Sequence, residues 1–225
     1  MDFFEILKNI KVPDWFGVYE NDTTCLSPDA EWYESQIYAE ARKIGISIST
    51  AWGCSQFVII TEDKQVFKIP FNGFFYDDND EHYDACFEYF KVNHSDKTVE
   101  AYENAITEGV EQFFSGIECI GYSCNQYPIY RQEWAQTYAE DDSSKPSEDS
   151  TTKAKNLSKE IHYIPFYTDW LASAIDTYGE EFVKKLLWFV DKYDITDLHR
   201  NNYGYNQAGR PVVFDYSGFD DSIAW

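Results

Sequence analysis

The most informative part of the chain reads Asp194-Ile-Thr-Asp197-Leu198-His199-Arg200-Asn201-Asn202, and it is followed by Val212-Val213-Phe214-Asp215. Asp197 lies five residues before Asn202, and Asp215 lies thirteen residues after Asn202. The β-branched run before Asp215 predicts a short strand, so Asp215 would stand at the end of a strand that follows the loop. Magnesium prefers oxygen ligands from one or two side chains, completed by phosphates and water. An Asp and an Asn on one loop, with a second Asp at the end of a strand, would provide such a set of oxygen ligands for magnesium.

Two predicted helices lead into this loop. The first begins near residue 167 and is interrupted at Gly179, and the second covers residues 180–193. Apolar residues recur at helical spacing along both segments: Trp170, Leu171, Ala174, Ile175 and Tyr178, then Phe182, Val183, Leu186, Leu187 and Val190. The second helix would support the loop that carries Asp197.

The first part of the chain combines helices with strands. Residues 1–45 predict two short helices, punctuated by Pro13, Pro28 and Gly45. Three β-branched and aromatic runs follow, at residues 46–50, 57–61 and 66–70. The last two runs are separated by Glu62-Asp63-Lys64, which indicates a hairpin. Lys68 would then lie inside the last strand, on the same face as Val66.

A long helix is predicted from about residue 97 to residue 115, because apolar residues repeat along it at helical spacing: Val99, Tyr102, Ile106, Val110 and Phe113. Glu103 falls at the edge of this stripe, where a half-buried acid is out of pattern. Two more extended runs follow near residues 117–123 and 128–134. Residues 137–160 are polar and acidic, and predict a flexible insertion.

The order of elements predicts an α+β protein with two lobes. The expected parts are an N-terminal helical extension (1–45), a β-rich N-lobe with one large helix (46–136), a flexible acidic insertion (137–160) and a helical C-lobe with the catalytic and metal-binding loops (161–225).

The motifs resemble those of the protein-kinase-like fold. Asp197-Leu-His-Arg-Asn-Asn202 looks like the catalytic loop of aminoglycoside-phosphotransferase-like and related atypical kinases, and Asp215-Tyr-Ser-Gly resembles the metal-binding Asp-Phe-Gly element with one extra residue. The chain also resembles kinase-like proteins common in phage and mobile-element genomes. Val66-Phe-Lys68-Ile resembles the strand that carries the phosphate-binding lysine of kinases.

The resemblance implies roles for these residues. Asp197 would orient the acceptor hydroxyl or act as its base, and Asn202 and Asp215 would hold Mg²⁺. Lys68 would contact the α- and β-phosphates of ATP, with Glu103 as its ion-pair partner and Glu100 as the alternative. The other candidate nucleotide-binding residues are Gly53 in the phosphate loop, Glu133 and Ala135 in the hinge, and His199 in the catalytic loop, as a phosphate contact or a loop brace.

The sequence departs from the kinase pattern in three ways. The phosphate loop, Ser49–Gln56, has only Gly53 where several glycines are usual. No histidine-arginine pair precedes Asp197, and the sequence continues for only ten residues after Asp215. These features predict a truncated C-lobe, and either a minimal phosphotransferase or a pseudokinase.

The charge balance suggests an alternative function. The chain carries 18 basic and 40 acidic residues, for a net charge of −22. Direct binding to nucleic acid is not expected, because few cations could neutralise phosphates. An inactive kinase-fold protein could instead use its acidic surface to inhibit or regulate a basic, nucleic-acid-binding protein. The odd cysteine count and the lack of a long apolar run favour a cytoplasmic protein, or one in the host cytoplasm if phage-encoded, with no membrane contact.

Overall fold

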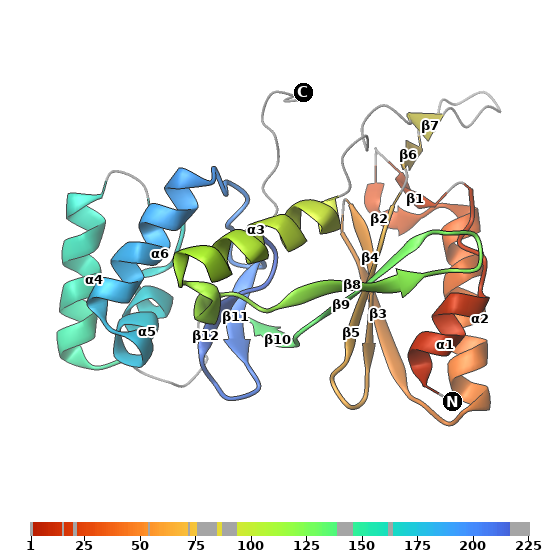
Figure 1. The fold of residues 1–225 in the computed structure, drawn as a ribbon, viewed down its shortest axis with the longest axis horizontal. Helices are drawn as coiled ribbons and strands as arrows, with labels where there is room; N and C mark the ends of the chain where they lie inside the picture. The colour runs from red at the N-terminus through yellow and green to blue at the C-terminus, as the bar shows by residue number, and fades with distance from the viewer. Residues whose placement is uncertain are drawn as a thin grey trace. The chain divides into compact units, whose positions relative to one another are not determined.

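The computed structural model describes residues 2–14, 16–19, 22–53, 55–71, 73–75, 85–86, 94–138, 146–161 and 164–216. These residues form two compact units, which are described one at a time. Unit 1 contains Met1–Lys97 and Ile117–Gln132, and unit 2 contains Thr98–Gly116 and Glu133–Trp225. The combination of helices with sheets that are mainly antiparallel confirms the α+β prediction; β1 and β6 form a parallel pair (Figure 1).

Unit 1 is built on a five-stranded antiparallel sheet with the order β3-β4-β5-β9-β8. Its strands are β3 (Ile48–Trp52), β4 (Gln56–Thr61), β5 (Val66–Pro70), β8 (Ile117–Tyr122) and β9 (Pro128–Gln132). All five agree with the extended runs expected from the sequence. A second sheet has the order β2-β1-β6-β7, with β1 (Gly17–Tyr19), β2 (Asp22–Leu26), β6 (Gly73–Phe75) and β7 (Ala85–Cys86).

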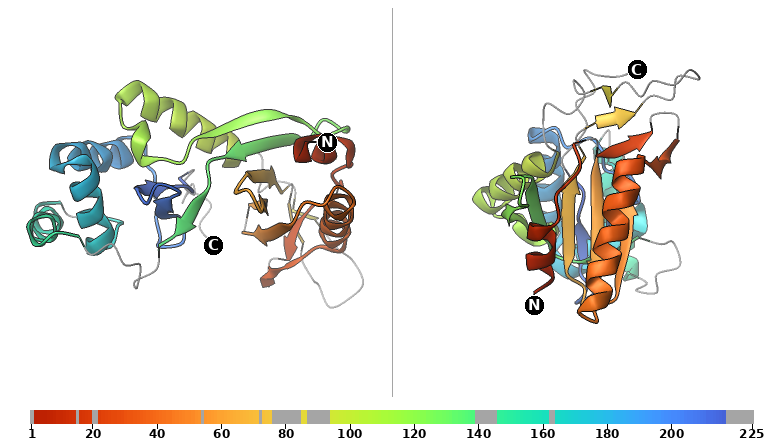
Figure 2. Two further views of the ribbon diagram at one scale, coloured as in Figure 1. Left: turned by 90° about the horizontal axis from the view of Figure 1, so that it is seen from below. Right: turned by 90° about the vertical axis from the view of Figure 1, so that its right-hand side faces the viewer.

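Two helices cover one face of the five-stranded sheet, as the right-hand view of Figure 2 shows for α2. They are α1 (Phe3–Asn9) and α2 (Pro28–Lys43). Ser27 caps α2 through its hydroxyl, which accepts a hydrogen bond from the Ala30 N–H, and Pro28 occupies the first turn. Both helices were expected, but they are not a separate extension. Their buried side chains, among them Leu7, Tyr33 and Ile37, belong to the same core cluster as the β4 residue Phe57.

Unit 2 contains most of α3 (His94–Glu108) and a short 3₁₀ turn, η1 (Glu111–Phe113). It also contains a three-stranded antiparallel sheet with the order β10-β11-β12 and three helices. Their bounds are β10 (Ala135–Thr137), β11 (Tyr203–Asn206), β12 (Pro211–Val213), α4 (Glu148–Glu160), α5 (Thr168–Tyr178) and α6 (Glu180–Lys192). Residues 98–116 thus group with the helices of unit 2 and not with the strands before them.

The predicted flexible insertion at residues 137–160 is wrong for its second half. Residues 148–160 form α4, which buries Ala154 and Leu157 and packs along α5. The helix begins where Asp176 of α5 accepts hydrogen bonds from the Ser147 N–H (2.7 Å) and the Ser150 hydroxyl (2.6 Å). These contacts hold the pKa of Asp176 below its usual range, the Ser150 hydroxyl being the first cause. α4 was not expected because residues 148–160 are mostly polar. Its few apolar residues are nevertheless buried where the helix packs along α5.

Candidate functional site

The loop that carries Asp197 is anchored by apolar residues on either side of it. Ile195 and Leu198 are buried, whereas Asp197 between them is partly exposed. The Ile195 N–H donates to the Val190 carbonyl of α6 (3.0 Å), and Asp194 adopts a left-handed conformation with φ +50. Asp tolerates this conformation better than most residues. The turn therefore sends the chain away from α6 while two apolar side chains fix the loop to the core.

A hairpin explains the spacing of thirteen residues between Asn202 and Asp215. β11 and β12 pair antiparallel, with Tyr203 opposite Val213. The Asn202 carbonyl accepts hydrogen bonds from the N–H groups of Phe214 (2.9 Å) and Asp215 (3.2 Å). The chain leaves Asn202, turns and returns, so that the backbones of Asn202 and Asp215 are in direct contact. Two of the predicted metal ligands are thereby brought together.

Asn202 also joins this hairpin to Asp197. Its side chain is buried, with the residue 6% exposed. Its Nδ2 donates to the Asp197 carbonyl (2.6 Å) and lies 3.2 Å from Asp197 Oδ2. Because the amide nitrogen is directed to Asp197, Oδ1 is the atom of Asn202 that could bind a cation. The predicted catalytic acid and both predicted metal ligands thus form one constellation within unit 2.

His199 lies beside Oδ1 of Asp197, the carboxylate oxygen that does not face Asn202. His199 Nε2 lies 3.6 Å from Asp197 Oδ1, and the Asn201 N–H donates to His199 Nδ1 (3.2 Å). Because Nδ1 accepts a hydrogen bond, a neutral His199 carries its proton on Nε2, which faces the carboxylate. The hydrogen bond to Nδ1 braces the loop, and the contact of His199 with phosphate remains a prediction.

Two buried tyrosines, Tyr203 and Tyr216, anchor the hairpin through hydrogen bonds of their hydroxyl groups. The buried Tyr216, next to Asp215, donates its hydroxyl to the Ser115 carbonyl (2.8 Å), and burial raises its pKa well above the ordinary value. The hydroxyl of Tyr203, next to Asn202, accepts from the Tyr167 N–H (3.1 Å), and burial raises its pKa to about 12. Both phenols stay neutral in the physiological range, so they serve as structural hydrogen-bonding groups and not as bases.

Gly204 is a requirement of this hairpin that the sequence did not reveal. A Cβ atom at this position would lie 1.8 Å from the Gln136 carbonyl oxygen of β10. Trp170 of α5 donates its indole N–H to the Gly204 carbonyl (2.9 Å), which holds the strand from the helix side. β11 was not expected from the sequence, since Tyr203-Gly-Tyr-Asn lacks the β-branched run that signals a strand.

The donor set suits a hard cation. Asp197, Asn202 and Asp215 offer carboxylate and amide oxygens, which Mg²⁺ prefers. Within the described part of the chain, no group of three or more His, Cys, Asp or Glu side chains could hold a metal by itself.

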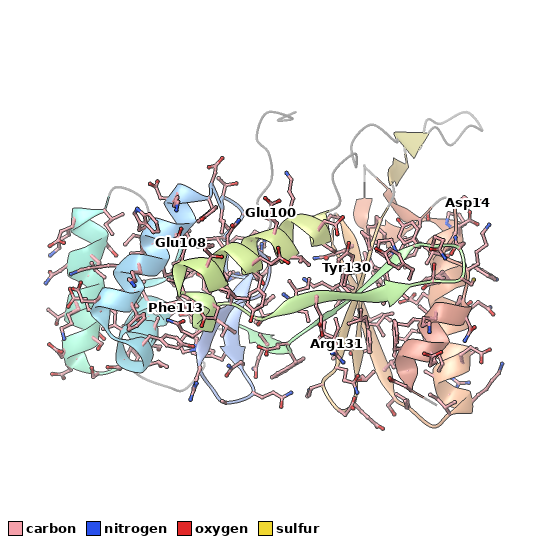
Figure 3. The ribbon with its side chains drawn as sticks, viewed as in Figure 1. Asp14, Glu100, Glu108, Phe113, Tyr130 and Arg131 are labelled. Atoms are coloured by element: carbon pink, nitrogen blue, oxygen red, sulfur yellow. The ribbon has the colours of Figure 1, made fainter. Side chains whose placement is uncertain are left out.

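Lys68 lies in unit 1, at the centre of the five-stranded sheet. It is buried, 4% exposed, and is paired across the sheet with Val58 on one side and Tyr130 on the other. Residues directly opposite in an antiparallel pair share a face, so Lys68 and Tyr130 lie on one face and Arg131 on the other; Figure 3 labels Tyr130 and Arg131. The Tyr130 hydroxyl donates to Asp96 Oδ1. Asp96, an exposed residue in the first turn of α3, is therefore an acid on the Lys68 face that sequence reasoning missed.

Glu103 was expected to be half-buried at the edge of an apolar stripe, and the structure contradicts this expectation. Glu103 is exposed, and so are Glu100, labelled in Figure 3, and Ile106, which is 53% exposed. The buried positions of α3 are instead Ser95, Thr98 and Ala105. The helix also ends at Glu108, so Val110 and Phe113 lie beyond it. The assumed apolar stripe gave the wrong rotation of the helix, and Glu103 is not a half-buried acid.

The remaining candidates occupy turns and strand ends. In unit 1, Gly53 follows β3, and its N–H donates to the Gln56 carbonyl (3.1 Å). A Cβ atom at Gly53 would meet nothing within 4 Å, so the fold does not require glycine there. In unit 2, the Glu133 N–H donates to the Gly116 carbonyl (2.9 Å), and Ala135 pairs with Asn206. The predicted hinge, near Gln132–Ala135, is where the chain passes from unit 1 to unit 2. Ser217 and Gly218 lie outside the described residues.

No protein-family model matches the chain, and no curated protein matches it. Among solved structures, the chain is similar to the GDP and kanamycin complex of the aminoglycoside phosphotransferase APH(2'')-IIIa. The two are 15% identical, with a TM-score of 0.34, over 83% of this chain and 72% of that chain. No helix among the described residues combines the length and the apolar character needed to span a membrane.

Proposed function

We propose that the protein is a kinase-like phosphotransferase that binds ATP together with Mg²⁺. The observation that carries the proposal is the constellation in unit 2, where the Asn202 side chain bonds to Asp197 and the Asn202 backbone bonds to Asp215. Phosphoryl transfer requires mainly that phosphates, metal and acceptor be positioned, and an acid beside two oxygen ligands meets part of that requirement.

Each residue has a distinct role in this proposal. Asn202, through Oδ1, and Asp215, through its carboxylate, would hold the cation, which neutralises charge on the phosphates when bound. Asp197 would orient the hydroxyl of the acceptor and accept its proton as that oxygen attacks the γ-phosphorus and ADP leaves. Its carboxylate is held by Asn202 at one oxygen and faces His199 at the other, which limits its rotation.

Lys68 is proposed separately as a phosphate-binding lysine. Burying an ammonium group without a partner is costly, so a lysine in the middle of a sheet indicates a specific electrostatic role. The presence of Asp96 and Tyr130 on the same face supplies groups that could keep the ammonium charged and oriented. The proposed adenine contact of Glu133 and Ala135 remains a prediction.

A thermal-shift titration tests the nucleotide site. ATP with Mg²⁺ should raise the melting temperature as ligand concentration increases, since a ligand that binds only the native state stabilises it. The shift should be lost in Asp215→Asn, which removes the charge but keeps the shape. Asp169→Asn, an exposed carboxylate on α5, is the matched control and should behave like the wild type. Equal shifts in wild type and Asp215→Asn would rule out the assigned metal ligand.

A further inference from the structure

Strand β3 is an unprotected edge of the unit 1 sheet. β4 pairs with one side of it, and within the described residues no strand pairs with the other side. Soluble proteins commonly protect such edges with lysine, proline or a bulge. β3 reads Ile48-Ser-Thr-Ala-Trp52, without a charge or a proline, and its pairing with β4 is regular. The backbone groups on its outer side are therefore suited to pair with another strand.

Helix α2 runs beside this edge. The Thr50 hydroxyl lies 3.1 Å from the Tyr38 hydroxyl and donates to Glu34 Oε1 (2.5 Å). The midpoint of β3 is thus level with the middle of α2. Residues at intervals of three or four lie on one side of a helix, so Glu31 and Arg42 share the β3 side with Glu34 and Tyr38. Glu31, Tyr38 and Arg42 are exposed, and this stripe begins acidic and ends basic.

We propose that a second copy of this chain pairs its own β3 antiparallel to this edge, about a two-fold axis through Thr50. The pairing would place Ser49 opposite Ala51 and Ile48 opposite Trp52 of the second copy. Such an interface is self-complementary, as two-fold symmetry requires. The exposed Trp52, 36% accessible, would then cover the partly buried Ile48 of the second copy.

The charge pattern of α2 favours a second copy over another occupant. The same two-fold axis sets the two α2 helices side by side and antiparallel, because α2 is centred near Thr50. The basic end of each stripe, at Arg42, then faces the acidic end, at Glu31, of the other copy. The two helix dipoles also oppose each other favourably. In a chain of net charge −22, most self-associations would bring like charges together, whereas this one pairs unlike charges.

Sedimentation equilibrium on the full chain tests this proposal without reference to nucleotide. The expected result is an average mass that rises with concentration toward twice the 26.4 kDa of one chain. Ala51→Lys should weaken the dimer about tenfold or more, since it brings lysines close to the symmetry axis. Ala51→Gln is the uncharged control and should still dimerise. A chain that stays monomeric throughout, or a dimer indifferent to Ala51→Lys, overturns the proposal.

A charge exchange locates the contact independently of the strand. Glu31→Arg alone and Arg42→Glu alone should each weaken the dimer, because each places like charges opposite one another. The double variant restores both contacts at once in a two-fold arrangement, so its dimer should approach that of the wild type. If the double variant is no better than the single ones, the antiparallel placement of α2 is wrong. Circular dichroism spectra that match the wild type would establish that each variant is folded.

Discussion

The hairpin that joins Asn202 to Asp215 and the sheet that holds Lys68 differ in what fixes the neighbours of their functional residues. In the hairpin, backbone hydrogen bonds hold Asp215 beside Asn202, and the side-chain amide of Asn202 bonds to Asp197, five residues earlier. Around Lys68, the identity of the neighbouring acid depends on the rotation of a helix that begins more than twenty residues later. Sequence spacing predicts well which residues lie together where backbone pairing fixes their positions. It predicts them poorly where side-chain packing determines the rotation of a helix.

The largest expected effect concerns Gly204, on which the hairpin depends. Gly204→Ala should reduce the free energy of unfolding of unit 2 by about 3 kcal/mol or more, because the new methyl group meets a backbone carbonyl that cannot move aside. Gly209→Ala is the matched control in the same hairpin. There a methyl group meets nothing within 4 Å, but φ is +71, so the cost should be only about 1 kcal/mol. Urea denaturation measures both, and equal costs would contradict the close approach of β10 and β11.

The second prediction concerns chemistry and assumes that an acceptor for the phosphoryl group is found. Asp197→Asn should lower kcat by about 10²–10⁴, the range typical of a lost general base. The melting temperature and the response to Mg²⁺ and ATP should change little, since an asparagine keeps the shape of the side chain. A variant that retains full kcat would remove Asp197 from the mechanism and leave only a binding site.

The third prediction compares Asp96 with Glu103, the acid expected from the sequence. Asp96→Ala should destabilise unit 1 by about 1.5–3 kcal/mol, because it leaves the hydroxyl of the buried Tyr130 without its charged acceptor. Glu103→Ala should stay within about 0.5 kcal/mol of the wild type, as is usual for an exposed residue. Urea denaturation would measure both variants. If Glu103→Ala lost more stability than Asp96→Ala, Glu103 and not Asp96 would be favoured as the acidic partner of Lys68.

The smallest expected effect concerns the start of α4. The folded-state pKa of Asp176 is lowered by its hydrogen bonds, so its contribution to stability is present above the unfolded-state pKa and is lost as pH falls through the folded-state pKa. Asp176→Asn should cost about 1 kcal/mol at neutral pH. The difference from the wild type should shrink in acid, below about pH 4, the ordinary pKa of an aspartate. A difference independent of pH would mean that the charge of Asp176 has no part in capping α4.

The fold was predictable from sequence wherever periodicity was strong. The five strands of the larger sheet, α1, α2, α5 and α6 were all expected near their observed bounds. α4 was hidden by its polar composition, and β11 by its glycine and tyrosines. The role of glycines was equally hard to predict. Nothing lies within 4 Å of a Cβ atom at Gly53, whereas a Cβ atom at Gly204 would meet a backbone oxygen. Such a contact arises from tertiary packing and leaves no local signal.

The proposed metal site can be tested most directly by electron paramagnetic resonance with Mn²⁺ in place of Mg²⁺. In the presence of ATP, the wild-type protein should bind Mn²⁺ beyond the amount that ATP binds alone. This protein-dependent binding should be lost in both Asn202→Ala and Asp215→Ala, and retained in Glu103→Ala. If the two site variants bind Mn²⁺ and ATP as the wild type does, the constellation of Asp197, Asn202 and Asp215 is not a metal site, and the kinase-like function proposed for this chain is contradicted.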